Sequence, residues 1–214
     1  PYSNDMGAKQ RKINPPLPLM RNEVVIEAPV DQTTLTGRYT DEAIRFIDAN
    51  RAQPFFLYLP HTFPHVPLFA SEAFKNKSAN GRYGDAVEEI DASTGRILDT
   101  LRALKLDQKT LVVFTSDNGP WKLAKNAWVK GNKNRRVGGF AHPLRGYKFS
   151  RFEGGMRVPT VMWWPGRIPA NRTCSEVVAS MDLMPTCAEL AGAKVPDDRV
   201  IDGKSIVSLL EGRD

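Results

Sequence analysis

Three short apolar runs stand out along the chain, and each has the length of a buried β-strand. They are "FFLYL" at 55–59, "LVVFT" at 111–115 and "VPTVMWW" at 158–164. Pro60 ends the first run, and Pro165 and Gly166 close the third. Apolar runs of about four to eight residues, bounded by turn-forming residues, are typical of buried strands. The sequence therefore predicts three strands.

Helical periodicity occupies much of the chain between these runs. Residues 82–104 place apolar side chains at helical spacing and charged side chains on the other face, which predicts the longest helix. A helix is also predicted from Thr40, as N-cap, through Ala49. Further helices are expected at 180–191, capped by Ser180 or Asp182, and at 205–212, whereas 1–38 and 119–157 are predicted to be irregular.

This alternation of strands and helices predicts an α/β domain with helices packed on a largely parallel sheet. In such sheets, binding residues lie on loops that follow the carboxyl ends of the strands. Those loops are "PHTFPHVP" at 60–67 and "SDNG" at 116–119. Both loops carry polar side chains suited to chemistry, so the site is expected there.

Charge is unevenly distributed along the 214 residues, whose formal net charge is +6. Residues 118–152 contain no Asp or Glu, and their Lys and Arg residues suggest either a solvated loop or a wall that attracts anions. Nucleic acid is not an expected partner, because no pattern of a known nucleic-acid-binding motif accompanies the charge. No apolar run is long enough for a transmembrane segment. Cys174 and Cys187 have no metal-type spacing, and two buried free thiols are favoured over a disulfide.

Asp117 and Asn118 follow the second apolar run and supply a carboxylate and an amide oxygen. Hard divalent cations prefer such oxygen ligands. The same residue types also end strands in Asx turns, in which the side chain accepts a backbone N–H two residues on. The sequence leaves both interpretations open, and two ligands can form only part of a cation site.

Two further segments contain residues that suit an anionic substrate. His65 lies between Pro64 and Pro67, and a histidine in such a stiff loop can protonate a leaving group near neutral pH. Lys148 lies in the basic, glycine-containing segment 143–159 and can act as a point charge toward an oxyanion. An ordinary surface histidine and a basic turn remain the alternatives.

Five ordered motifs together resemble the type I sulfatases, which are formylglycine-dependent enzymes of the alkaline phosphatase superfamily. In chain order they are "PFFLYLPHTFPHVP", "GDAVEEIDASTGRILDTL", "TLVVFTSDNGP", "PLRGYKFSRFEGGMRVP" and "DLMPTCAELAG". "PYSND" at the start is most similar to the arylsulfatase A branch. The resemblance covers nearly the whole chain and implies an alkaline phosphatase-like α/β fold.

The resemblance implies a role for individual residues. Asp117 and Asn118 match metal ligands, with Ca²⁺ as the expected cation and Mg²⁺ as the alternative. Lys148 matches the lysine that binds the sulfate group, and His65 matches the histidine near the leaving oxygen. Both are therefore expected to be catalytic and substrate-binding. Ser3 matches a serine that contacts substrate in some arylsulfatases. Glu153, Gly154, Gly155 and Arg157 match a motif with an architectural role.

Several family features have no counterpart in the sequence. Neither cysteine fits the C-x-P-x-R pattern from which formylglycine arises, and the Asp-Asp pair and "GKWHLG" segment of the family are absent. The resemblance therefore implies that residues 1–214 are the central-to-late part of a sulfatase catalytic domain without its C-terminal subdomain. We expect this segment alone to be inactive, with formylglycine supplied upstream and the remainder of the same polypeptide as a partner.

The expected function of the complete protein is hydrolysis of sulfate monoesters of a sulfated small molecule or glycan. A sulfated carbohydrate is favoured because of the basic segment. Two alternatives stay open: a phosphate or phosphonate monoester hydrolase of the same superfamily, and a non-catalytic module that binds sulfated glycans. The resemblance also implies an exported location, in a periplasmic, secreted or lysosomal-type compartment.

Overall fold

The computed structural model describes residues 16–121 and 138–213. The chain divides into two compact units. Unit 1 comprises Pro1–Leu104 and Ser116–Val158, and unit 2 comprises Lys105–Thr115 and Pro159–Asp214. All described residues that the sequence nominates for the site belong to unit 1.

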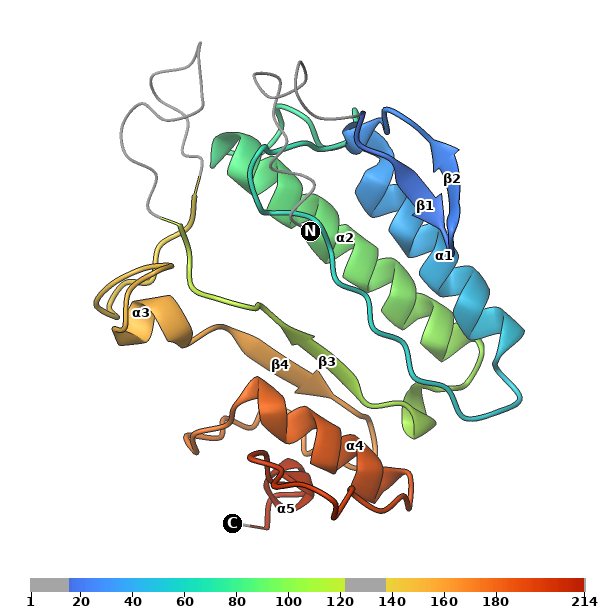
Figure 1. Ribbon diagram of the computed structural model, residues 1–214, viewed down its shortest axis with the longest axis vertical. Helices are drawn as coiled ribbons and strands as arrows, with labels where there is room; N and C mark the ends of the chain where they lie inside the picture. The colour runs from blue at the N-terminus through green and yellow to red at the C-terminus, as the bar shows by residue number, and fades with distance from the viewer. Residues whose placement is uncertain (1–15, 122–137, 214) are drawn as a thin grey trace. The chain divides into compact units, whose positions relative to one another are not determined.

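Two long helices, α1 (Leu35–Ala49) and α2 (Gly81–Ala103), lie side by side in unit 1 (Figure 1). The hydroxyl groups of Thr40 and Ser93 form a buried hydrogen bond of 2.6 Å between these helices. At the surface, Arg96 pairs with Asp41 at 2.7 Å. The predicted helix 82–104 is confirmed to within one residue at each end.

The start of α1 differs from the prediction that Thr40 is its N-cap. Asp31 caps a 3-10 turn, η2 (Gln32–Thr34), by accepting the Thr33 N–H at 3.0 Å, and α1 continues directly from that turn. Thr40 therefore lies inside the helix, where its buried hydroxyl also donates to the Thr36 carbonyl at 2.7 Å. These hydrogen bonds satisfy a polar side chain that would otherwise be costly to bury.

The main core of unit 1 forms where α1, α2 and the loop after residue 60 meet. Its buried members are Leu35, Phe63, Ala86 and Ile90. A hairpin of β1 (Leu19–Arg21) and β2 (Val24–Glu27) precedes α1, so the prediction that residues 1–38 are irregular is wrong for this part of the chain. Partly buried Leu19 packs against the core.

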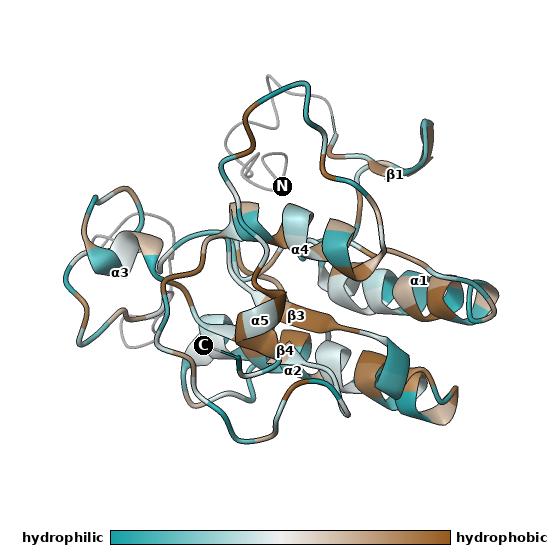
Figure 2. Ribbon diagram, turned by 90° about the horizontal axis from the view of Figure 1, so that it is seen from below, coloured by the Kyte–Doolittle hydropathy of each residue, from teal (hydrophilic) through white to brown (hydrophobic). Residues whose placement is uncertain are grey.

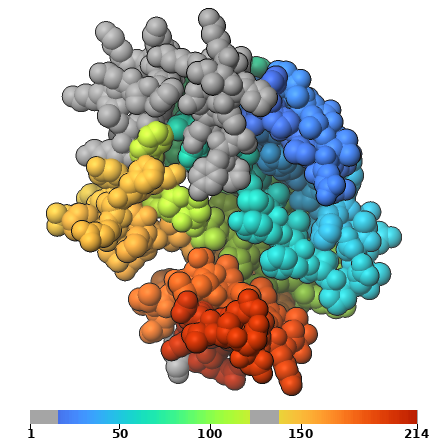
Figure 3. Space-filling model, in the orientation of Figure 1, coloured from blue at the N-terminus to red at the C-terminus, as the bar shows by residue number. Residues whose placement is uncertain are grey.

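The run "FFLYL" does not form the predicted buried strand in the described structure. Residues 54–62 are extended without assigned strand pairing. Phe55 packs edge-to-face on Phe46 of α1, with ring centroids 5.9 Å apart. Phe56 and Tyr58 point the other way and are 74% and 76% exposed. The segment that follows α1 contributes to the visible face in Figure 3. One side of this extended segment is therefore packed and the other is bare.

Unit 2 contains the other two predicted strands, β3 (Val112–Thr115) and β4 (Thr160–Trp163). They pair antiparallel, with Val112 opposite Trp163 and Thr115 opposite Thr160. Figure 2 shows that hydrophobic residues concentrate on these strands. The short elements of this unit are η3 (Asp107–Lys109), η4 (Ser180–Asp182), α4 (Leu183–Leu190) and α5 (Val207–Leu210).

Both strand pairs in the described residues are antiparallel, which differs from the expected parallel neighbours. The excursion 116–159 that joins β3 to β4 is long enough for either direction, so chain order alone did not determine the pairing. Within that excursion the described part contains a single helical turn, α3 (Glu153–Met156). Among the described helices, none has the length and apolar character needed to cross a bilayer.

Candidate functional site

The turn that carries Asp117 and Asn118 is tied to the segment that carries Lys148. The Gly119 N–H donates to the Gly155 carbonyl at 3.0 Å, and the Lys148 N–H donates to the Pro120 carbonyl at 2.9 Å. These two backbone hydrogen bonds join segments about thirty residues apart in the sequence. The structure thus brings together the proposed metal ligands and the proposed sulfate-binding lysine.

The glycines of these segments allow the close approach. A Cβ atom at Gly119 would lie 2.0 Å from the Gly154 carbonyl oxygen, and one at Gly155 would lie 2.4 Å from the Ser150 carbonyl oxygen. Both distances are far shorter than any tolerated contact, so only glycine fits at these buried positions. The Glu153–Arg157 ion pair of 2.8 Å spans the turn α3. These contacts support an architectural role for this motif.

The geometry excludes the Asx-turn interpretation of Asp117 and Asn118. An Asx turn at Asp117 would use the Gly119 N–H, which instead donates to Gly155. An Asx turn at Asn118 would use the N–H of Pro120, which proline lacks. The turn is closed by the Ser116 hydroxyl, which donates to the Asn118 carbonyl at 3.1 Å. The Asp117 carboxylate and the Asn118 side-chain amide therefore do not form the hydrogen bonds that close the turn.

The donor chemistry of this turn fits a hard cation such as Ca²⁺, but the number of donors is incomplete. Asp117 is exposed and Asn118 is half-buried. Across residues 16–121 and 138–213, no group of three or more His, Cys, Asp or Glu side chains gathers in a metal-binding arrangement. Calcium takes about six to eight oxygen ligands. Asp117 and Asn118 can therefore hold only one side of such an ion.

His65 lies in the loop after "FFLYL" and is half-buried. Its Nδ1 atom lies 2.8 Å from the Val66 carbonyl oxygen. Because a carbonyl only accepts hydrogen bonds, this contact places a proton on Nδ1. The neighbouring His61 differs, because its Nδ1 is buried without a hydrogen-bond partner and burial lowers the pKa of its ring. His65 is thus better suited to proton transfer.

Helix α2 anchors both of the loop regions that carry predicted site residues. On one side, the Ser71 N–H donates to the Glu89 carboxylate at 2.9 Å, and Phe63 shares a buried cluster with Ala86. On the other, a Cβ atom at Gly139 would lie 2.7 Å from the Tyr83 hydroxyl and 3.2 Å from Pro120. Nothing in the sequence indicated that Tyr83 lies against Gly139. Burial raises the pKa of the Tyr83 hydroxyl.

Some sequence predictions fall outside the described residues or need correction. Ser3 and most of the basic stretch, residues 122–137, lie outside them. Both cysteines are free thiols, as favoured, but the prediction that both are buried is wrong because Cys174 is exposed and Cys187 is only partly buried. Cys174 lies in an irregular, mostly exposed segment and not on the apolar face of a helix, so nothing buries its thiol.

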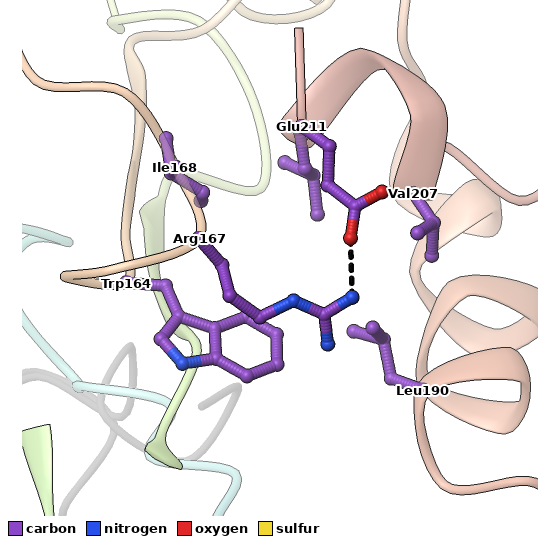
Figure 4. Close-up of a pocket in the computed structure, with 7 residues that line it drawn as sticks. Trp164, Arg167, Ile168, Leu190, Val207 and Glu211 are labelled. Carbon is purple, nitrogen blue, oxygen red and sulfur yellow. Dashed lines mark hydrogen bonds and ion pairs between the residues drawn. The ribbon is translucent and has the colours of Figure 1, made fainter. Parts of the chain in front are cut away.

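A small pocket in unit 2 does not belong to this site. It is lined by apolar side chains together with Arg167 and Glu211, which pair with each other (Figure 4). The Arg167 guanidinium also lies 4.6 Å from the centre of the Trp164 ring. These charged groups are already satisfied by one another, so the pocket is explained by packing of the segment that follows β4 against α4 and α5.

Comparison with known proteins identifies the relatives of this chain. Human steryl-sulfatase is 43% identical over 195 residues, which are 91% of this chain and 33% of that protein. The N-acetylgalactosamine-6-sulfatase of Sus scrofa is 41% identical over 219 residues, covering 97% of this chain and 40% of that protein. The chain thus spans only a third to two fifths of the length of these curated relatives.

A solved structure supports the same relationship and the expected fold. The crystal structure of Ps i-CgsB in complex with k-i-k-neocarrahexaose matches with a TM-score of 0.73 and 33% identity. The match covers 92% of this chain and 42% of that one. The α/β, alkaline phosphatase-like fold expected from the motifs is therefore confirmed for this part of the domain. Because the sulfatase family profile matches residues 2–193, the chain belongs to the sulfatase family.

Proposed function

We propose that the complete protein hydrolyses sulfate monoesters and that this chain supplies the metal-side and leaving-group residues of its active site. The observation that carries the proposal is the backbone link between the Asp117–Asn118 turn and the Lys148 segment. It joins the segment that carries Asp117 and Asn118 to the segment that carries Lys148, and this supports a shared site for the two proposed oxygen ligands and the ammonium group. Family membership supports sulfate rather than another tetrahedral anion as the target.

Each residue has a distinct task in this mechanism. Lys148 binds the sulfuryl oxygens and stabilises the negative charge that they carry in the transition state. The Nδ1–H group of His65 donates a hydrogen bond to the Val66 carbonyl. The Nε2 atom donates a proton to the departing alcohol oxygen. Asp117 and Asn118 hold the metal side of the site. When bound there, Ca²⁺ or Mg²⁺ supplies Lewis-acid polarisation of a sulfate oxygen.

Residues outside this chain complete the proposed site. We propose that the attacking group, formylglycine in this family, and the remaining metal ligands come from polypeptide beyond these residues. This fits the share of the relatives that the chain covers. We also propose an exported location for the protein. Ser3 remains a proposed substrate contact.

The substrate class is proposed to be a sulfated carbohydrate. One relative is named for N-acetylgalactosamine and another for steryl sulfate, so the names alone do not choose between a sugar and a sterol. The run of Lys and Arg between residues 118 and 152 favours a polyanionic glycan. Similar rates on a neutral monosulfated sugar and on a sulfated polymer would argue against this preference.

The test uses the full-length polypeptide with aryl sulfate and aryl phosphate assayed in parallel. We expect sulfate hydrolysis that falls by about two to three orders of magnitude in Lys148→Ala, the typical effect of removing a group that stabilises transition-state charge. Lys109→Ala, which removes an exposed charge outside the basic run 118–152, is the control and should remain active. Preference for phosphate, or equal rates in both variants, would contradict the proposal. Glycan binding without turnover would favour the non-catalytic alternative.

A further inference from the structure

Phe149, the residue immediately after Lys148, is unusually placed for a large apolar side chain. It is 85% exposed in the described structure. Its backbone φ angle is +74°, in the left-handed region that residues with a Cβ atom rarely adopt. Segment 140–156, drawn in gold, contributes to the visible surface in Figure 3. Solvent exposure and backbone strain both disfavour phenylalanine here, so packing within this unit does not explain the residue.

A tight turn fixes this conformation. The Ser150 N–H donates to the Tyr147 carbonyl at 2.9 Å, and the Ser150 hydroxyl accepts the Tyr147 N–H at 3.0 Å. Phe149 occupies the third position of this turn, where a positive φ ordinarily favours glycine. The Lys148 N–H is held at the same time by Pro120. The turn therefore presents Lys148 and Phe149 together, in a fixed relation to the Asp117–Asn118 turn.

The two aromatic rings of this turn region have different surroundings. The Arg145 guanidinium lies 3.8 Å from the centre of the Phe152 ring and so covers one face of it. The Lys148 ammonium lies 5.5 Å from the centre of the Phe149 ring, at the limit of a cation–π contact. Phe149 therefore keeps its ring accessible beside an ammonium group. An ammonium next to an open aromatic face suits a ligand with an anionic group attached to a ring.

We propose that Phe149 is a specificity-determining residue whose ring stacks on the apolar face of the cyclic group that bears the sulfate ester. Lys148 binds the sulfate, and Phe149 contacts the ring to which it is attached. This inference rests on the proposed function, because it places the ester at Lys148. Local strain of this kind is retained at sites where ligand contacts depend on it. Stacking on an aromatic ring needs a flat partner, so an acyclic sulfate ester gains nothing from Phe149.

The experiment compares cyclic and acyclic substrates with variants of the full-length polypeptide. Phe149→Asn removes the ring but keeps a residue that tolerates the left-handed region. Phe149→Tyr keeps the ring, and Phe149→Gly removes both the ring and the strain. Val177→Asn, at an exposed apolar side chain of unit 2, is the control for added surface polarity. The substrates are a monosulfated monosaccharide, an aryl sulfate and a short alkyl sulfate.

We expect Phe149→Asn and Phe149→Gly to lower kcat/KM for the two cyclic esters about tenfold, mainly through KM, as loss of one stacking contact does. The alkyl sulfate should change less than about twofold, and Phe149→Tyr should match the parent protein. A larger loss on the sugar than on the aryl ester would identify the sugar as the preferred ring.

Equal losses on cyclic and acyclic esters, or no loss on either, would overturn the role of Phe149. In both of these cases the parent protein is still an active sulfatase, so the proposed function stands. Failure of the parent protein to hydrolyse any sulfate ester would instead overturn the proposed function, and this inference with it.

Discussion

Asp85 is the buried charge on which the loop between His65 and α2 most depends. Its side chain is 1% exposed and accepts three backbone N–H groups, from Asn76 at 2.9 Å, Lys77 at 3.1 Å and Ser78 at 2.8 Å. Replacement by alanine removes the acceptor for all three donors at once. We therefore predict that Asp85→Ala releases this loop from the start of α2.

The magnitude follows from which of the three donors water can reach. Ser78 is buried, so its orphaned N–H should cost about 1–3 kcal/mol. Asn76 and Lys77 are exposed, and water would restore most of their hydrogen bonding. Loss of two charge-assisted bonds there adds roughly 1–2 kcal/mol. The total is about 2–5 kcal/mol. Asp85→Asn should cost less, because one oxygen remains while its NH₂ group opposes one donor.

Native-state hydrogen exchange of the full-length polypeptide measures this change locally. Protection of the amides of residues 76–78 should fall by at least about thirtyfold in Asp85→Ala, since 1.4 kcal/mol corresponds to a factor of ten. Asp99→Ala is the matched control on the same helix, because its carboxylate forms only a surface ion pair with Arg102. Equal protection in the two variants would refute the reasoning.

Three other positions give shorter tests. Burial lowers the pKa of His61 from its ordinary value of 6.5, so the unfolded chain binds a proton here at a higher pH than the folded chain does. The contribution of His61 to the free energy of unfolding should therefore be fully present above about pH 6.5 and be lost as the pH decreases. Thermal unfolding of His61→Gln should lack this loss. Gly119→Ala would place a methyl group 2.0 Å from a carbonyl oxygen and should cost about 1–3 kcal/mol in unfolding experiments, whereas Gly95→Ala, which has open space, should be neutral or stabilising. Thr186→Val removes the acceptor of the Ile206 N–H at 3.0 Å and should reduce exchange protection of that amide; unchanged protection would contradict this.

Elements whose stability is local could be predicted from the sequence, and elements that depend on distant partners could not. The periodicity of 82–104 located α2 to within one residue, because the spacing of apolar residues that defines its buried face is a property of this segment alone. The run 55–59 was predicted to be buried, but an apolar run does not show whether both of its faces are covered. The start of α1 was missed because Asp31 caps a preceding 3-10 turn.

The candidate site shows the same division. The residue types of Asp117, His65 and Lys148 and their ordered motifs were visible in the sequence, and the family relationship follows from them. The hydrogen bond from Gly119 to Gly155 was not, because it joins loops whose approach depends on tertiary packing. The glycines were the only available signal. Phe149 gave no signal, since its backbone conformation is known only from the structure.

The bare side of the extended segment 54–60 has a consequence for handling the protein. An uncharged, aromatic-rich stretch that has no assigned strand partner among the described residues is a template for intermolecular β-pairing. Phe56 and Tyr58 would be the first side chains to meet in such an association. If these 214 residues are produced alone, we therefore expect self-association through this segment to limit the usable protein concentration.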